Sequence, residues 1–216
     1  MDRTDCRPVT RRFLLTILLP ITLAVALPWV RGSRAQTPAA ELVSVMQAGG
    51  VVVFLRHAET VQSQIDTGRL GDRQGQRNLS ESGIEQARAL GDAFRVLDIP
   101  LSQVLASPVF RARDTAELAF GVDGFEVSMD IVADDYAGGA VAEMVEATRR
   151  LLLMPPETGA SVLLVGHRTP LALVTGQPFP DSVLPEGAMA VLRPDGGDEL
   201  RLLGTLTADE LIDAAR

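Results

Sequence analysis

The sequence predicts a three-layer α/β/α sandwich, a single domain built around a mostly parallel central sheet. Short apolar runs that are typical of buried strands alternate along the chain with stretches of helical periodicity. A chain of 216 residues with 46% hydrophobic content is large enough to bury the core of one such domain. Two final apolar runs around a Pro-Asp-Gly-Gly turn indicate a hairpin at one edge of the sheet.

The first half of the domain carries clear element signals. A β-branched run at 51–55 predicts a buried strand, and Ser80 is placed as the N-cap of a helix that runs to about Leu97. Leu79 and Ile84 occupy the positions of a hydrophobic staple at that helix start. Further along, the pattern predicts strands at 102–106 and 126–129, with a helix at 111–120 between them.

The second half continues the alternation. We expect a helix at 141–153, ended by two prolines, and then a buried strand at 161–165. Thr169 and Pro170 are predicted as the N-cap and first residue of the following helix. The edge hairpin pairs 188–192 with 200–206.

The first 35 residues read as a secretory signal peptide. An arginine-rich front precedes an uncharged apolar run at 13–30, and Ser33 and Ala35 provide the small residues of a cleavage site. We predict cleavage after Ala35, a mature domain at 36–216, and a periplasmic or secreted location. A retained membrane anchor is the alternative, although the run is short and Pro20 and Pro28 interrupt it. The export route, general secretory or twin-arginine, stays open.

Composition excludes several functional classes. The chain has 28 acidic and 20 basic residues, which argues against a general nucleic-acid-binding surface, and its single cysteine excludes a disulfide framework or a cysteine-based zinc site. Residues 36–216 alone carry 14 basic and 26 acidic residues, a net charge of −12. Because such a protein repels anions at long range, any anion site must be a local cluster of arginines. We expect no stable membrane span once the signal is removed.

Basic side chains follow three of the predicted strands. Arg56 and His57 follow the first, Arg111 lies shortly after the second, and His167 and Arg168 follow the fourth. Ligands of open α/β sheets bind outside the carboxyl ends of the strands. Taken alone, each of these residues has a purely structural explanation, as a hydrogen-bonded histidine of the core or as an arginine exposed to solvent. Together they predict an anion-binding site.

These residues lie in motifs that resemble the histidine phosphatase (phosphoglycerate-mutase-like) superfamily. The Arg-His-Gly hallmark of that family stands here as Arg56-His57-Ala58, followed by Glu59 and Thr60. The other motifs follow in the order of the family within residues 50–170: Asn78-Leu79-Ser80-Glu81-Ser82-Gly83-Ile84-Glu85-Gln86-Ala87, Ala106-Ser107-Pro108 with Arg111, Ala112-Arg113-Asp114-Thr115-Ala116 and Val165-Gly166-His167.

The resemblance implies that His57 is the nucleophile and is transiently phosphorylated on a ring nitrogen. It implies that Arg56, Arg111 and His167 are catalytic residues that complete the phosphate pocket, with no metal ion and no cofactor. Arginine suits this role because its planar fork binds phosphate through two hydrogen bonds and keeps its charge. We therefore expect an exported phosphoric monoester hydrolase that acts on a small-molecule or envelope-displayed phosphorylated substrate, with no nucleic-acid partner.

Two departures from the family pattern leave alternatives open. Ala58 replaces glycine, and we expect the added methyl group to be tolerated. The general acid is not evident: Asp134 is the choice, with Asp130, Asp135 and Glu143 as other candidates, while Glu59 is expected to be a structural partner. Without a working acid the protein would be a non-catalytic phosphate-binding pseudo-phosphatase, or a phosphohistidine or protein phosphatase.

One further segment bears on the site. We expect residues 60–76 to form a loop over the pocket. At the end of this loop, Gln76 and Arg77 either contact the substrate or face water, and the sequence does not decide between these two possibilities.

Overall fold

The computed structural model describes residues 37–216 together with Met1. The predicted signal peptide lies outside the described residues, so its cleavage and the alternative of an anchor stay predictions. Within residues 37–216, no helix combines the length and the apolar character that a membrane crossing requires.

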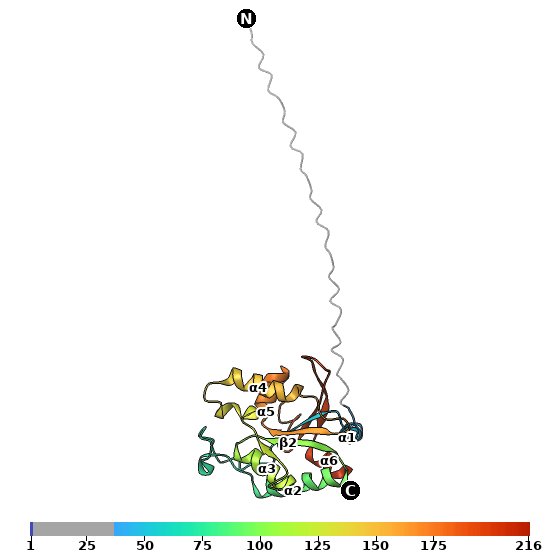
Figure 1. Cartoon of the computed structure of the whole chain (residues 1–216). Helices are drawn as coiled ribbons and strands as arrows, with labels where there is room; N and C mark the ends of the chain where they lie inside the picture. The colour runs from blue at the N-terminus through green and yellow to red at the C-terminus, as the bar shows by residue number, and fades with distance from the viewer. Residues whose placement is uncertain (2–36) are drawn as a thin grey trace. The chain divides into compact units, whose positions relative to one another are not determined.

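A six-stranded sheet forms the middle layer of the domain (Figure 1). Its strand order is β3-β2-β4-β1-β5-β6, with bounds β1 Val52–Arg56, β2 Leu101–Ala106, β3 Glu126–Val127, β4 Ser161–Gly166, β5 Met189–Pro194 and β6 Leu200–Leu206. The first four strands pair in parallel, and β5 and β6 form an antiparallel hairpin at one edge. The predicted mostly parallel sheet with an edge hairpin is confirmed.

Alternating side chains of the sheet enter two separate apolar cores. On β1, Val53 and Leu55 face one core and Val52 and Phe54 face the other. The first core is covered by α1 (Ala39–Ala48), α2 (Glu81–Val96), α3 (Phe110–Phe120) and α6 (Ala208–Ala214). The second is covered by α4 (Val141–Leu153) and α5 (Arg168–Thr175). Figure 1 shows α4 and α5 above the sheet and α2, α3 and α6 below it, which confirms three layers.

The start of α2 is held against the segment that follows β1. Ser80 caps the helix as predicted, because its hydroxyl accepts a hydrogen bond of 3.0 Å from the Gly83 N–H. A Cβ at Gly83 would collide with the backbone carbonyl oxygen of Glu59. Glycine is therefore required where the helix crosses the chain just beyond His57.

The start of α5 differs from the prediction. The helix begins at Arg168 and His167 occupies the N-cap position, so Thr169 and Pro170 lie inside the first turn. A proline is accepted there because the first N–H groups of a helix have no partner within the helix. The consequence is that His167 itself stands at the junction of strand and helix.

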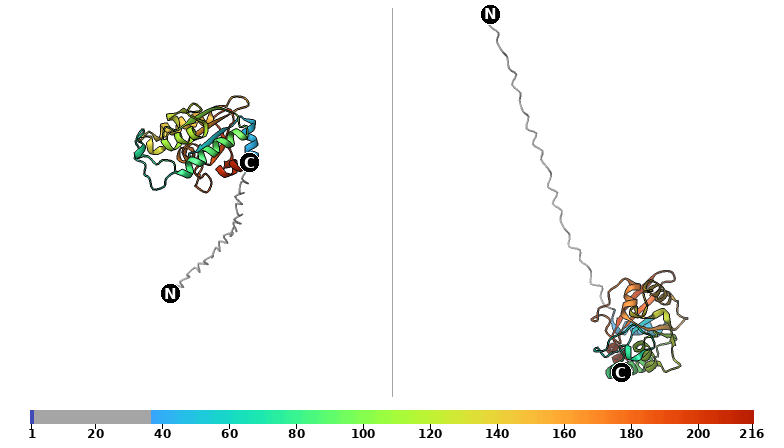
Figure 2. Two further views of the ribbon diagram at one scale, coloured as in Figure 1. Left: turned by 90° about the horizontal axis from the view of Figure 1, so that it is seen from below. Right: turned by 90° about the vertical axis from the view of Figure 1, so that its left-hand side faces the viewer.

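Two helices that were not predicted, α1 and α6, lie side by side against the same core (Figure 2). For α6 a local signal existed: Thr207 and Glu210 form a reciprocal capping box. The start of α1 has no such signal, because Pro38 makes no side-chain cap.

Candidate active site

The two histidines meet at the carboxyl ends of β1 and β4. These strands are parallel neighbours in which Arg56 pairs with Gly166, and the N–H of His57 donates to the carbonyl of Gly166 at 3.0 Å. The imidazole centroids of His57 and His167 are 5.4 Å apart, with the rings inclined at 52°. Residues 110 positions apart in the sequence therefore share one site.

The two predicted arginines are buried next to these rings. Arg111 lies in the first turn of α3, and Arg56 is the last residue of β1. Their exposed fractions are 4% and 7%, so each guanidinium has left bulk water and requires compensating partners. The structure thus brings together all four predicted site residues, and their catalytic roles remain to be tested.

Hydrogen bonding sets the tautomer of His57. Its Nδ1 lies 2.9 Å from the carbonyl oxygen of Ala58, which can only accept, so Nδ1 carries the hydrogen. The lone pair is then on Nε2. Ala58 makes this contact with an ordinary negative φ, since Asp98 is the non-glycine residue with positive φ in the described part of the chain. The added methyl group is accommodated without backbone strain.

Both imidazoles are held neutral. Burial, and then the charges of Arg111 and Arg56, lower the pKa of His57 well below its usual range. Burial and the charge of Arg111 do the same to the pKa of His167, with a further contribution from His57. A neutral ring with a free Nε2 is the form of histidine that can act as a nucleophile.

His167 has a different hydrogen-bond partner. Its Nε2 lies 2.9 Å from the hydroxyl of Ser107, which follows β2, and its Nδ1 is buried without a protein partner. Because a hydroxyl both donates and accepts, His167 can place its hydrogen on Nδ1 and present a donor. This arrangement suits a group that binds an anion.

Carboxylates from two loops hold the arginines. Nη1 of Arg56 pairs with Asp181 at 2.5 Å and donates to the carbonyl of Leu184 at 2.7 Å. Nη1 of Arg111 contacts both carboxylate oxygens of Asp66 at 3.0 and 3.1 Å. The predicted loop at 60–76 therefore does lie at the site, and it supplies Asp66.

The contacts leave one buried nitrogen of each arginine without a partner. The Nε atoms of Arg56, Arg77 and Arg111 are buried and make no hydrogen bond within residues 37–216, as is also true of Nδ1 of His167. Buried donors normally find acceptors. An oxyanion such as phosphate offers several acceptor oxygens to donors of this kind.

The candidate acids differ in burial. Asp130, Asp135 and Glu143 are exposed, whereas Asp134 is half-buried in the short 3-10 helix Asp134–Tyr136. Burial and the charge of Asp135 raise the pKa of Asp134, which favours a protonated carboxyl.

Glu59 instead accepts hydrogen bonds from Ser80 and Ser82 at 3.3 and 2.8 Å. The carboxylate therefore holds the start of α2, in agreement with the structural role expected for it.

Four acidic or phenolic residues at the site were not predicted: Asp66, Tyr136, Asp181 and Glu186. The hydroxyl of Tyr136 donates to Asp66 at 2.5 Å, so Tyr136 supports the carboxylate that holds Arg111. Although burial acts to raise the pKa of Asp66, the bonds from Tyr136 and Arg77 and the charge of Arg111 lower it overall. Each residue lies outside the strands and α-helices, and no local pattern marks it.

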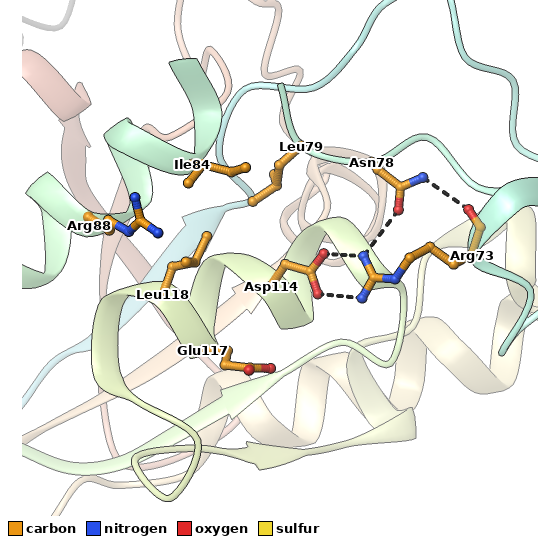
Figure 3. A pocket seen from close by; sticks show the side chains of 8 residues that line it. All are labelled: Arg73, Asn78, Leu79, Ile84, Arg88, Asp114, Glu117 and Leu118. Carbon is orange, nitrogen blue, oxygen red and sulfur yellow. Dashed lines mark hydrogen bonds and ion pairs between the residues drawn. The ribbon is translucent and has the colours of Figure 1, made fainter. Parts of the chain in front are cut away.

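A cavity of about 480 Å³ opens beside Arg56 and is lined by charged side chains, among them Glu59, Arg77, Arg168 and Glu186. A separate pocket of about 340 Å³ lies between α2 and α3 (Figure 3). It contains none of the four predicted site residues, and its Arg73 is paired with Asp114 at 2.5 Å. Of the four predicted site residues, Arg56 lines the first cavity.

The family model of the histidine phosphatase superfamily (branch 1) matches residues 52–151. Residues 52–151 belong to the histidine phosphatase superfamily. Members of this superfamily are phosphatases. The matched stretch includes Arg56, His57 and Arg111 and ends before His167.

Solved structures share this histidine phosphatase fold. The protein histidine phosphatase SixA, solved with tungstate, is 18% identical with a TM-score of 0.50, over 74% of this chain and 99% of that chain. An Escherichia coli K-12 protein provisionally assigned as an alpha-ribazole-5'-P phosphatase is 16% identical with a TM-score of 0.54, over 74% and 98%. A phosphoserine phosphatase from Entamoeba histolytica is 14% identical with a TM-score of 0.51, over 74% and 98%. Comparison with curated proteins gave no match.

Proposed function

We propose that this protein is an exported phosphatase that hydrolyses phosphomonoesters through a phosphohistidine intermediate on His57. The observation that carries the proposal is the hydrogen bond from Nδ1 of His57 to Ala58, which leaves the lone pair of Nε2 in a buried site beside two arginines. A phosphoryl group in transfer spreads negative charge over its equatorial oxygens, so positioning and positive charge supply most of the catalysis.

The chemical steps use groups of this chain and water. Nε2 of His57 attacks phosphorus, and the bond from phosphorus to the ester oxygen breaks as the leaving oxygen takes a proton from Asp134. Water then attacks the phosphohistidine, gives its proton to the Asp134 carboxylate, and releases phosphate and neutral His57. The arginines supply the positive charge for both steps, so we propose that no metal ion is needed.

Asp134 is proposed as the general acid on two grounds. Its pKa is raised by burial, and it is the half-buried member of the four candidate carboxyl groups. A raised pKa increases the share of Asp134 that carries a proton at a given pH, which favours acid catalysis of alcohol departure.

The test is release of phosphate from an aryl phosphate, from an alkyl phosphate and from a phosphoramidate. Wild-type protein should hydrolyse both esters, and His57→Ala should not. Asp134→Asn should slow the alkyl ester most, because an alkoxide needs protonation more than an aryl oxide does. Hydrolysis of the phosphoramidate alone would instead assign a phosphohistidine phosphatase. Vanadate binding without any turnover would assign a non-catalytic phosphate-binding protein.

Export is proposed from the pattern of residues 1–35. N-terminal sequencing of the protein recovered outside the cytoplasm should give a chain that starts at Gln36. An N-terminus that still carries Met1 would contradict cleavage and favour the retained anchor.

A further inference from the structure

Arg77 brings a third guanidinium to the site. It lies between the loop at 60–76 and the cap of α2, and its Nη2 contacts Oε1 of Glu186 at 3.3 Å. Nη2 of Arg56 lies 3.6 Å from the same oxygen. One carboxylate thus stands between two arginines, and the three groups together keep a net positive charge.

Glu186 is itself firmly placed, which fixes the position of Arg77. Its side chain is 10% exposed, and it accepts hydrogen bonds from the backbone N–H and the hydroxyl of Thr60 at 2.9 and 2.8 Å. Thr60 is three residues beyond His57, so this anchor belongs to the segment that carries the nucleophile.

The Nε of Arg77 is buried and has no partner within the described residues, like the Nε atoms of Arg56 and Arg111. The charge of Arg77 is also the last of the contributions that lower the pKa of His57 and of His167. An arginine that served only to neutralise Glu186 would not require a buried, unpaired Nε on a side chain that shares its carboxylate with Arg56.

We propose that Arg77 is a third phosphate-binding arginine of this site and contacts a non-reacting oxygen of the transferring phosphoryl group. The proposal rests on the proposed phosphatase function. With Arg56 and Arg111, Arg77 supplies three positively charged donors to a group that carries three equatorial oxygens. Glu186 is the positioning residue that holds Arg77 toward the site.

The test measures the binding of orthovanadate and inorganic phosphate by calorimetry, so that it does not depend on turnover. Arg77→Ala and Arg77→Gln should each weaken vanadate binding at least tenfold, while the thermal unfolding midpoint of Arg77→Gln stays close to that of the wild type. Arg88→Ala is the matched control, because Arg88 lines the separate pocket between α2 and α3 (Figure 3). Its vanadate affinity should remain within twofold of wild type.

A double variant distinguishes whether Arg77 binds the anion or only neutralises the charge of Glu186. If Arg77 only offsets Glu186, then Arg77→Gln combined with Glu186→Gln restores vanadate affinity, and the proposal is overturned. If Arg77 binds the anion, the double variant stays at least tenfold weaker than Glu186→Gln alone. Unchanged affinity in Arg77→Gln also overturns the proposal while the phosphatase function stands. If the wild type neither binds vanadate nor shows turnover, both the proposal for Arg77 and the proposed phosphatase function are overturned.

Discussion

His57 and His167 occupy matching places at the ends of two neighbouring parallel strands, yet the protein holds their rings in different ways. Nδ1 of His57 is tied to the carbonyl of Ala58, which only accepts. Nε2 of His167 is tied to the hydroxyl of Ser107, which can donate or accept. Among the described residues, the same side chain in the same topological position thus has Nε2 without a partner in one case and Nδ1 without a partner in the other, which suits the roles proposed for the two rings. The hydrogen-bond partner of each ring, rather than the residue type, makes this difference.

The largest effect is expected for the nucleophile. His57→Ala should abolish turnover, because it removes the atom that forms the covalent bond, while the fold is retained. Phosphate release from an aryl phosphate measures the loss, and circular dichroism checks the fold. Turnover near the wild-type rate would mean that the tautomer of His57 does not mark the nucleophile.

Arg111 tests what the two histidines share, since its charge lowers the pKa of both. Arg111→Ala should cost about 3 kcal/mol or more of transition-state stabilisation, as loss of one preorganised donor does. The ratio of kcat/KM values for wild type and variant gives this number. A loss of about tenfold or less would place Arg111 outside the phosphate pocket.

The pH dependence of stability tests the burial of both rings. In the folded state both pKa values lie well below 6.5, so the unfolded chain binds more protons as the pH falls below that value. The free energy of unfolding should therefore be highest above pH 6.5. Below that pH it should decrease by at most about 1.4 kcal/mol per histidine per pH unit.

Chemical denaturation between pH 7.5 and 5.5 measures this slope. His57→Ala should show a smaller slope, because one of the two rings is gone. An equal slope in variant and wild type would show that His57 contributes nothing to the pH dependence.

The smallest effect is expected for Ser107, the hydrogen-bond partner that distinguishes His167 from His57. Ser107 is buried and Ser107→Ala removes one hydrogen bond to His167, worth about 1 kcal/mol. Phosphate affinity should weaken modestly, and the rate of phosphohistidine formation under single-turnover conditions should change little. A loss as large as that of His57→Ala would give Ser107 a direct part in the chemistry.

Prediction from sequence succeeded where a signal is local. Ser80 reveals the start of α2, and α4 matches the predicted bounds of 141–153, ended by prolines. The same reasoning failed at α5, where the Thr-Pro pair read as a helix start but the helix begins one residue after His167. Where a helix directly follows a strand, the pairing of the strand in the sheet also determines where the helix starts. The Thr169-Pro170 pair alone therefore does not indicate the first residue of α5.

The candidate site divides in the same way. His57, His167, Arg56 and Arg111 could be found because strand ends in a parallel sheet converge on one edge. Asp66 and Glu186 could not, since they lie in irregular segments whose position depends on contacts far along the chain. For Arg77 the sequence left open whether it contacts the substrate or faces water.

From its residues alone, this chain determined a mostly parallel α/β sandwich and the four basic groups at its strand ends. Periodicity and short motifs carry that information because they depend on near neighbours. Only the tertiary structure decided which nitrogen of each imidazole is free and which carboxylates hold the arginines. Those properties arise from single contacts between distant segments, and a hydrogen bond of 2.9 Å to Ala58 or to Ser107 exists only once the chain has folded.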